Sequence, residues 1–285
     1  MRNFKLAAKF VKHNFFKLAL TALLPAVFMA FAHNPALKFF TLLNLSAMPD
    51  DFWGVMQGIA MIADWRKMLV FIFMGVLFCV FISSTVGAIE RRMRYGEFYE
   101  EGGVIKFFLR KVNDNFLHVF KYVLTVLLIF EALSVMEALL VFLWRQVLGE
   151  ISMIVVSAIT ALVFSMLAMG IFTATIFTLP NMTVRGYNLS QSLAASFRTF
   201  YKVKFFPVFL TLGLSCLISI LPLLGNALLV YFFRYSGNQI VIWILSFLWY
   251  YACFLLLPSY IYASYFDAED MERADMDEEE FTEIG

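Results

Sequence analysis

Two carboxylates, Glu131 and Glu137, interrupt a largely apolar stretch that covers residues 116–142. An ionisable side chain in hydrocarbon costs about 2.5–3.5 kcal/mol on insertion scales, so it usually marks a transport pathway or a structural pair. At about 1.5 Å per helical residue, Glu131 lies roughly 22 Å into the stretch and Glu137 roughly 31 Å, at the outer boundary of a membrane. Six residues also turn the two side chains about 120° apart, so they do not form a dyad. Glu131 is therefore the candidate functional residue within the membrane.

Two interpretations of Glu131 stay open. As a transport or proton-linked residue it would face a water-reachable cavity beside the hydroxyl residues of the stretch 151–179, and Glu131→Gln would abolish transport. As a structural residue it would accept a hydrogen bond from a Ser, Thr or Tyr of a neighbouring helix. Glu131→Gln would then be nearly silent, because an amide still accepts that bond. The lack of a second buried charge to pair with Glu131 favours the structural interpretation.

A basic cluster, Arg91, Arg92 and Arg94, follows the apolar stretch 68–89. Cations at the end of a membrane helix orient it and are attracted to anionic lipid, by about 1 kcal/mol each near the surface. The same cluster could contact the phosphate of a substrate, although no glycine-rich phosphate loop lies nearby. We therefore expect these three arginines to contact lipid headgroups or phosphate.

Signatures of enzymes are missing from the chain. The three histidines and three cysteines are dispersed, without the spacing of a metal site or a disulfide framework. No G-x-S-x-G, H-E-x-x-H or Walker sequence occurs. We therefore expect no enzyme, no catalytic, cofactor-binding or metal-ligating residue, no cofactor and no nucleic-acid partner.

The elements that position these residues follow from composition. Hydrophobic residues make up 62% of the 285 residues and charged residues 15%, whereas soluble domains are about half apolar and about a quarter charged. This composition predicts an all-α integral membrane protein. Six stretches approach or exceed the roughly 20 apolar residues that a membrane helix needs: 15–32, 68–89, 116–142, 151–179, 205–232 and 240–265.

An amphipathic stretch that runs into an apolar one occurs three times. The copies begin at Leu6, Lys106 and Leu193, and the changes from polar to apolar chain fall at Asn14-Phe15, Asn115-Phe116 and Lys204-Phe205. The two later copies also share a lead-in, because Gly96 and Gly186 each lie 11 residues before a phenylalanine, Phe107 and Phe197. Such internal similarity predicts three repeated hairpins of two membrane helices. Each hairpin would follow a cytoplasmic interfacial helix, near residues 3–12, 103–114 and 190–201.

The distribution of lysine and arginine predicts the orientation. With the amino terminus in the cytoplasm, 17 of the 22 basic residues fall in cytoplasmic segments. The positive-inside rule therefore predicts that both termini are cytoplasmic.

The two ends of the chain carry the remaining alternatives. The first apolar stretch, which ends in AFA before His33, also fits a cleaved signal peptide. A retained helix is the better interpretation, because the same junction recurs before two stretches that cannot be signals. Residues 1–266 form the predicted membrane domain. Residues 267–285 hold 10 acidic residues and one basic residue, which predicts a disordered cytoplasmic tail, with docking on the basic loops as the alternative.

At these residues the chain resembles the YesL-like family of uncharacterised bacterial multi-pass membrane proteins. The resemblance rests on Asn14-Phe15 and the apolar run to Pro25, on FFLRKVNDNF from Phe107, and on the basic turn that ends in Gly96. A looser likeness to the membrane domain of some glycerophosphodiesterases rests on the order of elements around Arg185-Gly186. The chain departs from the first family by its outer loop, its length and its acidic tail.

The resemblance implies a protein of the bacterial cell (inner) membrane, associated with sugar uptake systems. The expected function is a non-enzymatic accessory or assembly factor of a transport or envelope system. The alternative is a small-solute or lipid transporter that uses Glu131. The expected partners are the lipid bilayer, anionic lipid headgroups and a transporter or envelope protein.

Overall fold

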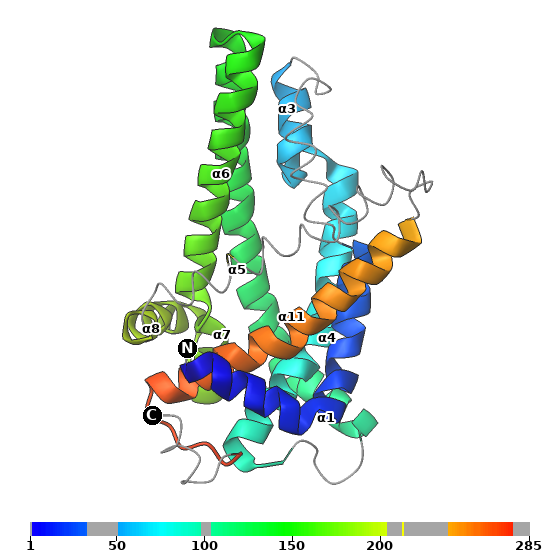
Figure 1. Cartoon of the computed structure of the whole chain (residues 1–285), viewed down its shortest axis with the longest axis vertical. Helices are drawn as coiled ribbons and strands as arrows, with labels where there is room; N and C mark the ends of the chain where they lie inside the picture. Colours follow the sequence, from blue (N-terminus) through cyan, green and yellow to red (C-terminus); the bar gives the residue numbers. More distant parts are fainter. Residues whose placement is uncertain (1, 33–50, 98–103, 204–212, 214–238, 276–285) are drawn as a thin grey trace.

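The computed structural model describes residues 2–32, 51–97, 104–203, 213 and 239–275. These residues form helices and, within the described ranges, no strand (Figure 1). The elements are α1 (Arg2–Ala32), α3 (Phe52–Ile59), the 3₁₀ turn η2 (Met61–Ala63), α4 (Trp65–Tyr95), α5 (Val104–Val147), α6 (Glu150–Thr175), α7 (Thr178–Arg185), α8 (Leu189–Lys202) and α11 (Gln239–Ala268).

Within the described residues, four helical segments are long and apolar enough to cross a membrane. They are Ile72–Tyr95, Ile105–Val147, Val155–Arg185 and Ser246–Ala268. They overlap four of the six predicted stretches, so the prediction of an all-α, membrane-embedded chain is confirmed at this level. The predicted stretch 15–32 falls in the second half of α1, where the apolar helix Phe15–Phe28 is shorter. The predicted stretch 205–232 lies outside the described residues, except for Gly213.

The helix α1 bends at the first predicted junction. Asn14 has non-helical backbone angles (φ −113°, ψ 16°), and its side-chain Nδ2 donates to the carbonyl of Phe10 at 2.9 Å. The part before Asn14 buries Leu6, Ala7 and Phe10, and α1 packs along α11. The amphipathic start of the chain therefore covers another helix with its apolar face (Figure 1).

The helix α5 differs from the prediction at the second junction. It is a single helix of 44 residues, about 66 Å long, with no break at Asn115-Phe116. No glycine or proline occurs between Val104 and Val147, so nothing in the chain interrupts the helix where its surface changes from polar to apolar. Close packing on α4 supports this region, because a Cβ added to Gly87 would lie 2.7 Å from Asn115 Nδ2.

The two glycines of the predicted lead-in play the same role. Gly96 follows the last residue of α4 with φ +75°, and Gly186 follows the last residue of α7 with φ +70°. Residues with a Cβ rarely adopt this left-handed conformation, which commonly ends helices. The phenylalanines 11 residues later do not correspond, because Phe107 is 3% exposed and Phe197 is 46% exposed.

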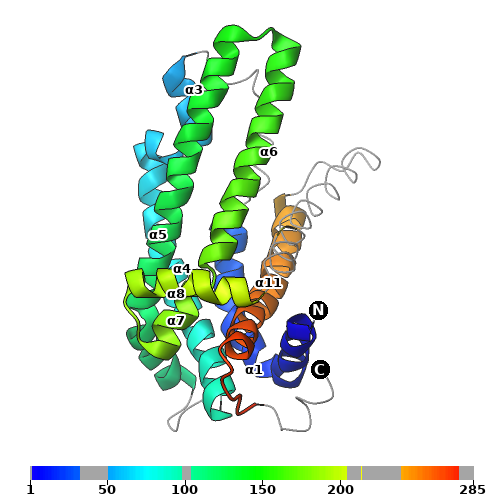
Figure 2. The same cartoon turned by 90° about the vertical axis from the view of Figure 1, so that its left-hand side faces the viewer.

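Two apolar clusters hold the described helices together. The larger one joins α1, α4, α5, α7 and α11 through fully buried side chains such as Phe177, Tyr262 and Tyr265. The smaller one packs Val55, Met56 and Ile59 of α3 against Ala138 and Val141 of α5. Beyond the larger cluster, α5 and α6 continue as a hairpin, and α8 lies across the lower part of α6 (Figure 2).

Candidate functional site

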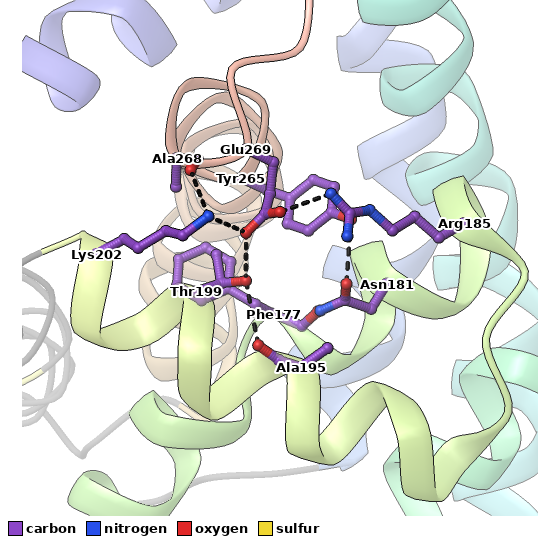
Figure 3. Close-up of polar contacts among 9 residues, drawn as sticks. All are labelled: Phe177, Asn181, Arg185, Ala195, Thr199, Lys202, Tyr265, Ala268 and Glu269. Atoms are coloured by element: carbon purple, nitrogen blue, oxygen red, sulfur yellow. Dashed lines mark hydrogen bonds and ion pairs between the residues drawn. The ribbon is translucent and has the colours of Figure 1, made fainter.

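A charged cluster joins the end of α11 to α7 and α8 (Figure 3). One carboxylate oxygen of Glu269, Oε2, accepts from Arg185 Nη2 at 2.6 Å. The other, Oε1, accepts from Thr199 Oγ1 at 2.9 Å and from Lys202 Nζ at 3.2 Å. A single carboxylate therefore ties the ends of three helices together.

Helix capping places these side chains. Arg185 ends α7, and after the left-handed Gly186 a capping box starts α8. In this box the side chain of Asn188 accepts from the amide of Gln191 at 2.9 Å, and the side chain of Gln191 accepts from the amide of Asn188 at 3.3 Å. This reciprocal arrangement satisfies two amides at the start of the helix and fixes its direction.

The end of α11 is also capped. The amide of Met271 donates to the carbonyl of Phe266 at 2.9 Å, and Asp270 has φ +50°. This pattern matches the helix ending in which a left-handed residue redirects the chain. Lys202 Nζ donates to the carbonyl of Ala268 at 3.4 Å, so α8 also supplies a cation to the negative end of α11.

The electrostatic environment favours the ionised form of Glu269. Burial raises the pKa of this carboxyl, but hydrogen bonds from Thr199 and Lys202 and the charges of Arg185 and Lys202 outweigh burial and leave the pKa below its ordinary value. The Glu269 side chain is only 11% exposed, whereas those of Arg185 and Lys202 are 30% and 54% exposed. The cluster therefore keeps a nearly buried anion between two partly exposed cations.

Uncharged hydrogen bonds extend the cluster inward. Tyr265 Oη donates to Asn181 Oδ1 at 3.1 Å, and Asn181 Nδ2 donates to the carbonyl of Phe177 at 2.9 Å. Nearby, the hydroxyls of Thr183 and Tyr262 lie 2.7 Å apart. These contacts satisfy buried polar groups that would otherwise cost about 1–3 kcal/mol each.

The first residues of the predicted acidic tail lie against the bundle. Arg273 and Asp275 form a two-pronged ion pair at 3.1 and 2.7 Å, with side chains 1% and 3% exposed. The amide of Ala274 donates to the carbonyl of Met93, in the last turn of α4, at 2.9 Å. A Cβ at Gly96 would lie 3.3 Å from the carbonyl oxygen of Ala274. Packed chain therefore continues past the predicted boundary at residue 267 as far as residue 275.

Glu131 lies on the other part of the molecule, beside η2. Its Oε2 accepts from the backbone amide of Ile62 at 3.3 Å, and its side chain is half-buried. This donor is a backbone amide of the segment before α4, whereas the structural interpretation expected a hydroxyl donor. Glu131 therefore links α5 to the turn that connects α3 and α4.

Three hydroxyl residues of α6 bond within their own helix. Thr160, Ser165 and Thr173 donate to carbonyls four residues earlier, at 2.7–2.8 Å. Thr160 Oγ1 also accepts from the indole Nε1 of Trp144 on α5 at 3.2 Å. These contacts are typical of hydroxyl residues that support helix packing in membranes.

The arginines predicted to contact headgroups make local contacts at the end of α4. Arg94 pairs with Glu90 at 3.5 Å and Arg91 with Glu97 at 3.7 Å. Arg91 and Arg94 also lie over the ring of Tyr95, at 5.7 and 5.4 Å from its centroid. Arg92, on the same turn, is half-buried. The structure thus keeps Arg91, Arg92 and Arg94 together, on a different helix from the residues of the Glu269 cluster.

Two acidic residues of structural weight were missed by reasoning from the sequence. Glu90 is 7% exposed and comes directly after the predicted stretch 68–89, where Arg94 four residues later is the one local signal of its pairing. Glu269 lies in the acidic run 267–285, whose composition predicts disorder. Its partners Arg185 and Thr199 lie 84 and 70 residues away along the chain, so no local pattern reveals them.

The Glu269 cluster is suited to joining helices. Three side-chain donors occupy three of the roughly four lone-pair sites on the two oxygens of Glu269, so most of its hydrogen-bonding capacity is directed at fixed partners. Comparison of the chain with protein-family models, with curated proteins and with solved structures found no match. The resemblance to the YesL-like family therefore stays a prediction.

Proposed function

We propose that this chain is a non-enzymatic integral protein of the bacterial cell (inner) membrane and acts as an accessory or assembly factor of a transport or envelope system. The observation that carries the proposal is the use made of the polar side chains. Glu269 joins three helix ends, and Glu131 bonds to the backbone of η2. Both arrangements favour a scaffold in which charged groups hold helices in place.

The proposed topology has six membrane helices in three hairpins, with both termini in the cytoplasm. Support comes from the four long apolar helices and the apolar half of α1, and from the basic residues in the segments assigned to the cytoplasm. The start of α1 and the end of α11 also lie at the same end of the molecule (Figures 1 and 2). An even number of crossings agrees with that arrangement.

Cysteine labelling tests this topology at two described positions. Gly149 lies between α5 and α6, and a Cβ there would meet no atom within 4 Å. Glu272 lies exposed after α11. In a chain without its native cysteines, Gly149→Cys should react with an impermeant maleimide on intact cells, and Glu272→Cys only after lysis. Labelling of both positions on intact cells would contradict the proposal.

Glu131→Gln separates the proposed function from the transporter alternative. A glutamine oxygen can still accept from the amide of Ile62, so a scaffold should keep its expression and its partners. A transporter that depends on the ionisable carboxyl should lose flux in proteoliposomes while expression stays intact. Solute or lipid flux by the wild-type chain that Glu131→Gln abolishes would overturn the proposal in favour of the transporter.

A further inference from the structure

We propose that the outward face of α8 lies in the plane of the cytoplasmic membrane surface and binds anionic phospholipid headgroups. The outward face is the side of α8 that carries Phe197, Arg198, Tyr201 and Lys202. The inference rests on the membrane topology proposed above, but it assigns a binding surface that this topology does not require.

The opposite side of α8 is closed by packing. Ser192, Ser196 and Thr199 are at most 1% exposed, and Ser196 Oγ donates to the carbonyl of Ala174 in α6 at 2.9 Å. Small side chains at this spacing let the two helices approach closely. Because α8 crosses the lower part of α6 (Figure 2), it lies parallel to the membrane surface if α6 crosses the membrane.

The outward face has an apolar edge and a basic edge. Phe197 and Tyr201 are 46% and 80% exposed, and four helical residues place them about 40° apart around the axis. Arg198 directly follows Phe197, and Lys202 directly follows Tyr201. Both cations therefore lie about 100° further round the helix axis, and both are exposed. A helix with adjacent apolar and basic edges lies in the interface, with its aromatic rings at the level of the headgroups and its cations on lipid phosphates.

A second copy of this pattern follows the other left-handed glycine. At the start of α5, Ile105 and Leu109 are 78% and 62% exposed, and each precedes a cation, Lys106 or Arg110. The spacing of four residues is the same as in α8. The element after Gly96 and the element after Gly186 therefore both present exposed apolar residues next to basic ones.

The charge of the outward face selects an anionic surface as the occupant. Arg198 and Lys202 give this face two positive charges, and no acidic residue occurs between Leu189 and Lys202. The Lys202 side chain is 54% exposed. Its Nζ donates to Glu269 and to the carbonyl of Ala268, which leaves one of its three N–H donors for an outer acceptor. Each cation near an anionic leaflet strengthens binding about fivefold, from about 1 kcal/mol per residue.

The test measures where the outward face of α8 lies in a bilayer. A fluorophore is attached to Tyr201→Cys or, as the control for an aqueous position, to Glu272→Cys, both in the full chain without its native cysteines. Glu272 is exposed after the end of α11. The proteins are reconstituted in vesicles of phosphatidylcholine and phosphatidylglycerol, and quenching is measured with nitroxide-labelled lipids and with aqueous iodide.

We expect the label at position 201 to be quenched by nitroxide lipid and shielded from iodide, and the label at 272 to show the reverse. Nitroxide phosphatidylglycerol should quench position 201 more than nitroxide phosphatidylcholine. Arg198→Gln should reduce this preference about fivefold, whereas Glu272→Gln should leave it unchanged.

Three results would overturn the inference. Equal iodide access at 201 and 272 would place the outward face in water. Shielding of position 201 from both quenchers would mean that protein, such as a second copy of the chain, covers it. Equal quenching by the two lipids would remove the selection for anionic headgroups. The cysteine-labelling test of the topology has a separate readout. Failure of the lipid-binding inference can therefore be distinguished from failure of the proposed topology.

Discussion

Glu269→Gln should loosen the contact between α8 and the end of α11 without unfolding the rest of the chain. Glutamine keeps the size of the side chain but loses its charge, so Arg185 loses an anionic acceptor at 2.6 Å. Hydrogen bonds to charged groups contribute about 1.5–3 kcal/mol. The pair with Lys202 is more exposed and adds only about 0–1 kcal/mol, and the bond from Thr199 can persist to the amide oxygen.

The expected loss of local stability is therefore about 2–3 kcal/mol. Each 1.4 kcal/mol changes an equilibrium about tenfold, so backbone amides of α8 should exchange hydrogen roughly 30- to 150-fold faster. Hydrogen–deuterium exchange of the purified protein in mild detergent, followed by mass spectrometry, measures this change for residues 189–202. Amides of the smaller apolar cluster, between α3 and α5, should exchange at their wild-type rate.

The matched control for this variant is Glu272→Gln. It removes the same charge from the same segment, but Glu272 is exposed, so exchange in α8 should stay within error of wild type. If Glu269→Gln and Glu272→Gln change exchange in α8 equally, the cluster does not hold the helices and the reasoning fails.

Three further predictions concern backbone packing and pH. Gly87→Ala should destabilise the protein by about 1–3 kcal/mol through overpacking against α5, because its Cβ would lie 2.7 Å from Asn115 Nδ2. Gly75→Ala should not, because a Cβ there meets no atom within 4 Å. Thermal unfolding in detergent compares the two variants, and equal melting temperatures would contradict the packing. Gly96→Ala and Gly186→Ala should each destabilise the protein by about 1–2 kcal/mol, because alanine disfavours the left-handed backbone. Only Gly96→Ala should also expose residues 269–275 to protease, because its Cβ would approach Ala274. Cleavage of residues 269–275 in both variants would refute this contact. The folded-state pKa of Glu269 is below its ordinary value of 4.5, so its contribution to stability is present above that pH and is lost as the pH falls through the folded-state pKa. The protection of α8 amides, taken relative to their intrinsic exchange rate at each pH, should therefore fall on acidification below about pH 4.5 in the wild type. Glu269→Gln, already loosened, should show a smaller fall.

Features that depend on nearby residues could be predicted from the sequence. The break at Asn14, the apolar helices and the paired glycines Gly96 and Gly186 each follow from composition or from residues a few positions apart. The boundary at Asn115 was predicted by analogy with Asn14, but α5 continues through it, because a change in surface polarity does not break a helix that lacks glycine and proline.

Features that depend on distant residues could not be predicted. Glu269 belongs to an acidic run whose composition indicates disorder, and the capped end of α11 is what turns it toward Arg185 and Thr199. Glu131 was predicted as a candidate because its surroundings are apolar. Its donor could not be predicted, because it is the backbone amide of Ile62, 69 residues away along the chain. Every residue except proline has such an amide, so the sequence does not mark this one.

The most direct test of the proposed function is to identify what the chain binds in its own membrane. Cells that express tagged wild-type chain or Glu131→Gln are cross-linked, and the proteins that co-purify in detergent are quantified by mass spectrometry. We expect a component of a transport or envelope system to be recovered at the same fixed ratio with both forms. Recovery of the chain alone in both forms, or loss of the partner with Glu131→Gln, would contradict it.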